Sequence, residues 1–290
     1  MAKLLTGREA AAALTAAGKE RAAELARRGI APKLVLLRCG GEAAELAYER
    51  GASARGEKTG VTVELRALPA DVTREALLAQ LDAVNGDPTV HGCLLLRPLP
   101  SHLRPWEQEI CDRLLPEKDV DGMTSASAAA LYLGRPQGFA PCTAEACLVL
   151  LDHYGIDCAG KRAVVIGRSP VVGRPAAMLL LARNATVTMC HTATRDLPRI
   201  TGEADLLVSA AGCLGCLTAA HVRAGQTVLD VSMNWDAARG CMAGDADFDA
   251  VASLVDAITP VPNGVGAVTS SVLMHHVLTA AERAAEGGGQ

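Results

Sequence analysis

Aromatic side chains are scarce in this chain, with two tryptophans, three tyrosines and two phenylalanines in 290 residues. Hydrophobic residues nevertheless make up 50% of the sequence. We therefore expect an interior packed mainly with small aliphatic side chains, in the Ala, Leu and Val runs that are typical of helices. A chain of this length is also long for a single hydrophobic core, which predicts two domains.

The sequence also lacks a basic block and a long apolar run, and each absence argues against one class of partner. The formal net charge is −4, which argues against nucleic acid. No apolar stretch reaches the roughly 18–20 residues that a membrane span requires. Arg8 and Glu9 interrupt the N-terminal apolar segment, so it predicts an amphipathic helix rather than a signal peptide. We expect a cytoplasmic protein.

Ten cysteines are scattered along the chain, and most of them lie inside apolar runs. A free thiol in such a run behaves as a small hydrophobic group. Cys213 and Cys216 form a C-x-x-C, but no second pair at metal-ligand spacing accompanies them. A plain loop is therefore favoured over a redox or metal site, and we predict no metal.

Helix and strand patterns alternate along the sequence, which predicts an α/β fold with a largely parallel sheet. The crevice between two such domains is the expected ligand site. We predict helices over residues 4–28, 42–58, 74–85, 106–115, 143–154, from 173 onward and about 272–284, and strands over 33–37, 61–65, 92–96, 163–166, 186–190, 206–209, 227–230 and 255–258.

The most informative stretch, residues 163–184, reads AVVIGRSPVVGRPAAMLLLARN. Gly167 ends an apolar strand and Gly173 opens a helix, whose free N–H groups and positive dipole end favour a phosphate. The spacing is G-x-x-x-x-x-G rather than the common G-x-G-x-x-G. Arg168 and Ser169 in the turn suit an added phosphate, which favours NADP over NAD. A structural turn with a solvated arginine is the alternative.

Motifs along nearly the whole chain occur in the order PEKDVDG (116–122), PCT (141–143), VVIGRSPVVGRP (164–175), ATVTMCH (185–191), ADLL (204–207), DVSMN (230–234) and ITPVPNGVGAVT (258–269). Together they resemble the methylenetetrahydrofolate dehydrogenase/methenyltetrahydrofolate cyclohydrolase family. The resemblance implies two α/β domains with a folate cleft between them. A folate-binding catalytic domain is expected over 1–140 and 268–290, and a Rossmann-like NADP-binding domain over 141–267. It also implies a homodimer.

The resemblance implies a folate site when residues are carried across one by one. Tyr48 matches the tyrosine that stacks on the aminobenzoyl ring, and Asp121 matches the carboxylate that hydrogen-bonds the pterin. Both are catalytic candidates. Asn263 replaces a glycine of the family's P-G-G-V-G loop, and asparagine tolerates a left-handed backbone. The other substrate-binding candidates are Pro262, Gly264, Gly266 and Thr269.

The resemblance also implies that NADP is the cofactor and that the second domain binds it. The matching positions surround the turn after the 163–166 strand and the ends of the two strands that follow it. They are Gly167, Arg168, Ser169, Val172, Gly173, His191, Arg195 and Ala211.

The family's catalytic element, Tyr-x-x-x-Lys on one helix, is incomplete in this sequence. The i, i+4 spacing brings the lysine over the tyrosine, but the stretch here reads Tyr48-Glu-Arg-Gly-Ala52. Ala52 occupies the lysine position. Leu96, in GCLLLRPLP, occupies the position of the supporting glutamine. Two members of one hydrogen-bonded pair are therefore both apolar.

Two further features of these segments bear on the site. Arg97, next to Leu96, is a candidate charge for the cleft, although strand alternation predicts that it points to the opposite face from Leu96. Gly51 and Gly56 are expected to weaken their helix by roughly 1 kcal/mol each relative to alanine.

The missing lysine affects the two reactions of the family differently. Hydride transfer from the methylene bridge requires mainly positioning of substrate and cofactor. Hydrolysis of the methenyl group requires proton transfers, to which a positioned lysine typically contributes about 10²–10⁴-fold. We therefore expect an NADP-dependent methylenetetrahydrofolate dehydrogenase with impaired or absent cyclohydrolase activity. The alternatives are a bifunctional enzyme with another acid/base, a catalytically silent folate- or nucleotide-binding paralogue, and a shikimate-dehydrogenase-like oxidoreductase.

Overall fold

The chain divides into two compact units, and the computed structural model describes residues 2–135 and 137–287. Unit 1 comprises Met1–Ala12 and Thr143–Thr269, and unit 2 comprises Ala13–Cys142 and Ser270–Gln290. Each unit has its own parallel sheet, so each is described by itself.

Unit 1 contains six parallel strands: β1 (Lys3–Leu4), β5 (Arg162–Ile166), β6 (Thr186–Cys190), β7 (Leu206–Ser209), β8 (Thr227–Asp230) and β11 (Ala257–Ile258). Their order across the sheet is β1-β11-β8-β7-β5-β6. Because β6 lies on one side of β5 and β7 on the other, the strand order reverses direction at β5. Such a reversal creates a crevice at the carboxyl ends of the strands, where ligands bind in open α/β sheets.

Buried aliphatic residues form the interior of unit 1. Val164, Leu207, Val228 and Ile258, from four neighbouring strands, belong to one buried cluster. The other elements with residues in this unit are α6 (Cys142–His153), α7 (Gly173–Ala182), α8 (Leu197–Gly202), the 3₁₀ turn η2 (Ala219–His221), the antiparallel pair β9 (Asn234–Asp236) and β10 (Cys241–Ala243), and α9 (Phe248–Ala252).

Unit 2 contains the three parallel strands β2 (Lys33–Cys39), β3 (Thr62–Leu68) and β4 (Gly92–Leu95), in the order β3-β2-β4. Four consecutive residues of β2, from 34 to 37, are completely buried, as expected for a central strand covered on both faces. The remaining elements are α2 (Ala43–Thr59), α3 (Arg74–Gly86), η1 (Arg104–Trp106), α4 (Glu107–Asp112) and α5 (Ser125–Tyr132).

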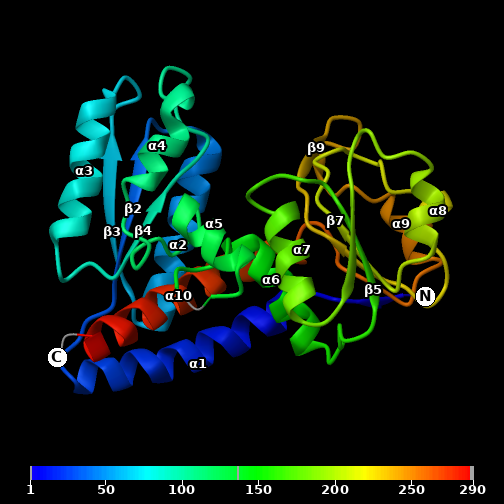
Figure 1. The fold of residues 1–290 in the computed structure, drawn as a ribbon, viewed down its shortest axis with the longest axis horizontal. Coiled ribbons are helices and arrows are strands. Elements are labelled where there is room, and N and C mark those ends of the chain that lie inside the picture. The colour runs from blue at the N-terminus through cyan, green and yellow to red at the C-terminus, as the bar shows by residue number, and fades with distance from the viewer. Residues whose placement is uncertain (1, 136, 288–290) are drawn as a thin grey trace. The chain divides into compact units, whose positions relative to one another are not determined.

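The long helices α1 (Gly7–Arg27) and α10 (Gly266–Gly287) run side by side, blue and red in Figure 1. Within unit 2 the Arg21 guanidinium joins them, because it donates to both carboxylate oxygens of Glu282 at 2.8 and 2.6 Å. Among the described residues, no helix combines the length and the apolar character needed to cross a membrane. All ten cysteines are free thiols in the described chain.

The predicted elements agree with the structure except at short segments and at the ends of several helices and strands. The strands predicted over 186–190, 206–209 and 227–230 have those bounds. The first helix begins at Gly7 rather than at residue 4, because Lys3 and Leu4 pair with β11 as an edge strand too short to show a periodic pattern. The last helix begins at Gly266 rather than near 272, and α5 was not predicted.

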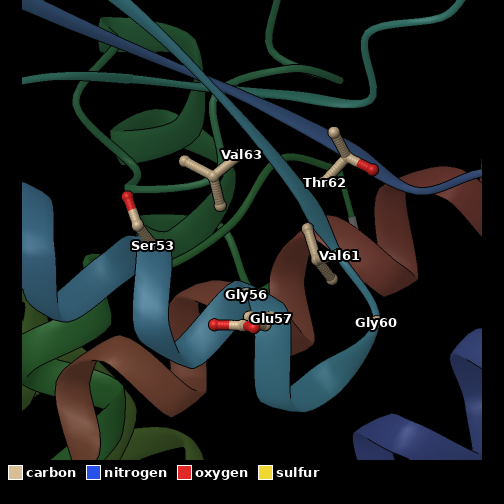
Figure 2. Close-up of a pocket in the computed structure, with 7 residues that line it drawn as sticks. All are labelled: Ser53, Gly56, Glu57, Gly60, Val61, Thr62 and Val63. Carbon is tan, nitrogen blue, oxygen red and sulfur yellow. The ribbon is translucent and has the colours of Figure 1, made fainter.

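The two glycines within α2 differ in their surroundings. A Cβ on Gly56 would lie 2.5 Å from Val63 Cγ2 and 2.8 Å from the Val61 carbonyl oxygen, at the corner between α2 and β3 drawn in Figure 2. A Cβ on Gly51 would meet no atom within 4 Å. The expectation that both glycines merely weaken the helix is therefore wrong for Gly56, which allows β3 to approach the helix.

Alanine substitution distinguishes these two glycines. We predict that Gly51→Ala stabilises unit 2 by about 1 kcal/mol, because only the helix propensity changes. Gly56→Ala is predicted to destabilise it by about 1–3 kcal/mol, because the added methyl group overpacks against β3. Urea denaturation of both variants measures the effects, and equal shifts in the same direction would contradict the assignment.

Candidate functional site

The loops after β5 and β7 touch at the point where the strand order reverses. Gly167 follows β5 and has a φ of +121°, and a Cβ there would lie 2.2 Å from the carbonyl oxygen of Ala210. Ala210 N donates to Ile166 O at 2.7 Å, which ties the second loop to the end of β5. Only glycine satisfies both the backbone angle and the contact.

A side chain within the turn, that of Ser169, and a second glycine, Gly173, close the turn between β5 and α7. A Cβ on Gly173 would lie 2.3 Å from Gly167 O. Ser169 Oγ accepts hydrogen bonds from Val172 N at 3.1 Å and from Gly173 N at 3.4 Å. The Ser169 hydroxyl therefore orders the start of the helix. The sequence predicted only a contact between this hydroxyl and a phosphate.

Three polar residues expected on the NADP side occur at the ends of β5 and β6. Arg168 follows Gly167. Arg168 and Arg195 are both exposed. His191 is partly buried and follows β6 directly, and its Nδ1 accepts from Ala193 N at 3.2 Å. Because Gly167 N donates to the carbonyl of Cys190 at 2.9 Å, Arg168 and His191 follow a joined pair of strand ends.

A buried carboxylate that the sequence interpretation missed organises the loop carrying Ala211. Asp245 is completely buried, and its oxygens accept from Ala211 N at 2.8 Å and Cys213 N at 2.8 Å. They also accept from the hydroxyls of Ser209 at 2.9 Å and Ser232 at 2.8 Å. No motif marks Asp245, because its partners lie up to 36 positions away in the sequence.

A second carboxylate, that of Asp230 at the end of β8, holds the backbone at Asp245. It accepts from Asp245 N at 3.0 Å and from Ala246 N at 2.8 Å, and it is 3% exposed. Burial raises the pKa of Asp230 to about 6, and the hydrogen bonds from the two amides oppose that rise.

Asp230 also borders a hollow of about 290 Å³ formed by residues 230–233 and 260–267. Three predicted substrate-binding residues, Pro262, Gly264 and Gly266, line this hollow. Asn263 has a φ of +80°, which confirms the expected left-handed backbone. A Cβ on Gly266 would meet no protein atom within 4 Å, so this glycine leaves open space. Thr269, also predicted here, lies one turn into α10 and donates to Val265 O at 3.5 Å.

In unit 2 the structure brings together Tyr48 and Asp121. Tyr48 lies on α2, where burial raises the pKa of its phenol well above the usual value and the nearby charge of Asp121 raises it further. The Asp121 side chain is 20% exposed. Burial raises the pKa of Asp121, whereas Arg97 and the hydrogen bond from Cys142 lower it. The arrangement places a neutral phenol beside an acceptor carboxylate.

The two aspartates of the PEKDVDG motif have different roles. Asp119 is completely buried, and its carboxylate accepts from Met123 N and Thr124 N at 2.9 Å each and from Ser127 Oγ at 2.6 Å. Asp121 accepts one long backbone bond, from Cys142 N at 3.4 Å. Asp119 therefore holds the loop, whereas Asp121 has fewer hydrogen-bond partners, all from Cys142, and keeps acceptor capacity for a ligand.

The apolar substitutions lie in the same unit. Ala52, one turn after Tyr48 on α2, is 1% exposed, and Leu96 is 8% exposed. Strand β4 ends at Leu95, so the side-chain alternation on which the predicted orientation of Arg97 rests does not extend to this residue. Its Nη2 lies 3.9 Å from Asp121 Oδ2.

The two units define an α/β protein of the dinucleotide-binding class. The chain belongs to the tetrahydrofolate dehydrogenase/cyclohydrolase family: the family's catalytic domain matches residues 5–121 and its NAD(P)-binding domain matches residues 141–285. The resemblance inferred from the motifs is thereby confirmed. Membership in this family decides against the alternative of a shikimate-dehydrogenase-like oxidoreductase.

Relatives match over nearly the full length of the chain. The "Bifunctional protein FolD" of Variovorax paradoxus (strain S110) is 45% identical over 285 residues, which cover 98% of this chain and 99% of that protein. The crystal structure of the bifunctional enzyme FolD from Campylobacter jejuni is 36% identical and has a TM-score of 0.93, covering 98% and 99% of the two chains. The Trypanosoma brucei methylenetetrahydrofolate dehydrogenase-cyclohydrolase, solved with NADP cofactor and inhibitor, is 34% identical with a TM-score of 0.91 and covers 98% of each chain.

The raised pKa of Asp230 predicts a pH-dependent stability. Because the folded state favours the protonated carboxyl, the contribution of Asp230 is fully present below its ordinary pKa of 3.8 and is lost as the pH rises through about 6. Relative to Asp230→Asn, the wild-type protein is predicted to lose about 3 kcal/mol of unfolding free energy between pH 3.5 and pH 7. Urea denaturation at a series of pH values tests this; a constant difference between the two proteins would refute it.

Proposed function

We propose that this protein oxidises 5,10-methylenetetrahydrofolate to 5,10-methenyltetrahydrofolate by hydride transfer to NADP, and that its cyclohydrolase activity is impaired or absent. The observation that carries the proposal is the buried Ala52 one helical turn from Tyr48. The family resemblance implies the amine of a lysine at this position, and an alanine methyl group can neither donate nor accept a proton. Leu96 removes the polar partner of that amine.

NADP is the cofactor of the proposed reaction and accepts the hydride when it is bound. The backbone supports its binding, since Gly167 and Gly173 pack so closely that a Cβ on either would overlap a carbonyl oxygen. The N-terminus of α7 follows this turn and favours a phosphate. Arg168 provides an exposed guanidinium for the additional phosphate of NADP, and the Trypanosoma brucei relative was solved with NADP. Val172, His191, Arg195 and Ala211 complete the proposed cofactor site.

The folate is proposed to bind through residues that each unit provides separately. Asp121 accepts from the pterin N–H groups and Tyr48 stacks on the aminobenzoyl ring. An analogue without those N–H donors leaves the buried carboxylate unpaired, which makes Asp121 a selective reader of the pterin edge. The 260–267 hollow and Thr269 provide the other proposed folate contacts.

Loss of one activity without the other follows from the different requirements of the two steps. Dehydrogenation depends on the relative position of substrate and nicotinamide, which binding provides. Hydrolysis adds water and breaks a C–N bond, and both steps move protons. The named relatives are bifunctional, and the apolar pair at Ala52 and Leu96 is the basis for a single activity here. The homodimer is proposed on the family resemblance, and the cytoplasmic location on the sequence features that argue against a signal peptide and a membrane span.

Restoring the amine tests the proposal directly. The wild-type protein is predicted to form NADPH from methylenetetrahydrofolate while leaving methenyltetrahydrofolate at its uncatalysed rate of hydrolysis. Ala52→Lys, alone or with Leu96→Gln, is predicted to raise hydrolysis by about 10²–10⁴-fold. Both reactions are followed spectrophotometrically on the purified protein.

Ser53→Lys is the matched control, because it places the same amine on the same helix about 100° away from position 52. Rapid hydrolysis by the wild-type protein that Ala52→Lys does not improve would refute the single-activity proposal. Absence of NADPH formation would instead favour the silent paralogue.

The cofactor assignment is tested at Arg168. We predict that Arg168→Gln raises the KM for NADP by roughly 10–100-fold, the effect of losing a charge-assisted hydrogen bond, and leaves the KM for NAD nearly unchanged. Arg183→Gln is the control, because Arg183 caps the opposite end of α7 and pairs with Asp152 at the surface. Equal effects on both cofactors would show that Arg168 does not read the additional phosphate.

A further inference from the structure

Arg97 lies between two carboxylates at the edge of the proposed pterin site. Its Nη2 is 3.9 Å from Asp121 Oδ2, and its Nη1 is 3.9 Å from Oε1 of Glu107, the first residue of α4. The Arg97 side chain is 20% exposed, so the guanidinium is largely withdrawn from solvent. A charge in this position interacts more strongly with its neighbours than a surface charge does.

The groups facing Asp121 come from several segments of unit 2. Tyr48 approaches from α2 as a neutral phenol, and Cys142 at the start of α6 donates its backbone N–H and a hydrogen bond from its thiol. Asp119, from the same loop, adds a negative charge that raises the pKa of Asp121. Arg97 provides positive charge at this carboxylate and lowers its pKa.

The nearest lysine in the sequence, Lys118, is directed elsewhere. Its Nζ donates to three backbone carbonyls, those of Val84 at 2.7 Å, Asn85 at 3.1 Å and Asp87 at 2.6 Å. With alanine at position 52, the cation that the structure places against Asp121 is therefore the Arg97 guanidinium.

The distance between Arg97 and Asp121 determines what the pair can do. At 3.9 Å the guanidinium is too far to donate a direct hydrogen bond, but close enough for strong Coulomb attraction. The pair Arg38–Glu49, also in unit 2, is hydrogen-bonded at 2.8 Å and so occupies an acceptor site of its carboxylate. Arg97 thus provides charge without occupying the lone pairs of Asp121.

We infer that Arg97 is a positioning residue for folate binding: its guanidinium, 3.9 Å from Asp121 Oδ2, supplies the positive charge that favours ionised Asp121, in place of the lysine charge missing at position 52, and does not itself occupy an acceptor site that the pterin N–H groups need. The inference rests on the proposed function, since it assumes that Asp121 binds the pterin.

The inference makes a signed prediction for pH. Protonated Asp121 loses acceptor capacity, so folate affinity falls as the pH drops through the pKa of this carboxyl. Removing the guanidinium leaves burial and Asp119 to raise that pKa further. The pH midpoint for loss of affinity is therefore expected to move upward in Arg97→Gln. Below the new midpoint, the Kd is expected to exceed the wild-type value by roughly tenfold or more.

Calorimetric titration with tetrahydrofolate, from pH 5.5 to 8.5, measures this midpoint without requiring turnover. Titration of the ligand itself is common to all variants and cancels in the comparison. Arg97→Lys keeps the charge and is expected to retain the wild-type midpoint. Glu107→Gln removes the competing carboxylate and is expected to move the midpoint downward. Arg113→Gln is the control, because Arg113 pairs with Asp82 at an exposed position.

Thermal unfolding of each variant shows whether it is folded, and the opposite shift in Glu107→Gln tests the inference even if Arg97→Gln does not fold. Wild-type midpoints in both Arg97→Gln and Glu107→Gln, with normal tetrahydrofolate binding, would overturn the inference and leave the proposed function standing. Failure of the wild-type protein to bind tetrahydrofolate at any pH would overturn both.

Discussion

The close approach of two backbone segments at Gly167 and Ala210 is the constraint on which the nucleotide-binding unit depends. A side chain at residue 167 would overlap the Ala210 carbonyl, and one at residue 173 would overlap the Gly167 carbonyl. The loops after β5 and β7 can therefore meet only with glycine at residue 167, and the turn into α7 can close only with glycine at residue 173. Their meeting point lies where the strand order reverses, which is where ligands bind in open α/β sheets and where we propose the phosphate site.

Buried carboxylates hold the loops in both units. Asp245 gathers amide and hydroxyl donors from the segments after β7 and β8, and Asp119 does the same for the turn that leads into α5. In each case a charge withdrawn from water is compensated by several hydrogen bonds, which makes the loop rigid. Asp121, two residues after Asp119, has few such bonds. Asp119 and Asp121 are both aspartates of one motif, so their hydrogen-bond partners, rather than their residue type, give them different roles.

The sequence predicted most of the secondary structure because the central strands are short apolar runs and the helices are long. Short elements such as β1 could not be predicted, since two residues show no periodicity and their pairing with β11 joins segments more than 250 positions apart. The family, the left-handed Asn263 and the two apolar substitutions were predictable from local motifs. The contacts of Asp245 could not be predicted, because its partners are distant in the sequence. The sequence marked Arg97 as a candidate charge for the cleft but left its direction open, because the strand ends two residues before it.

The exposure of Arg168 has a consequence for how such a protein can change over evolutionary time. Packing in the turn requires glycine at residues 167 and 173, whereas Arg168 is exposed. Replacing a solvent-facing side chain costs little stability. In the proposed cofactor site, where Arg168 contacts the additional phosphate of NADP, preference between the two nicotinamide dinucleotides is thereby separated from foldability, so descendants of this chain could exchange one coenzyme pool for the other without rebuilding the domain.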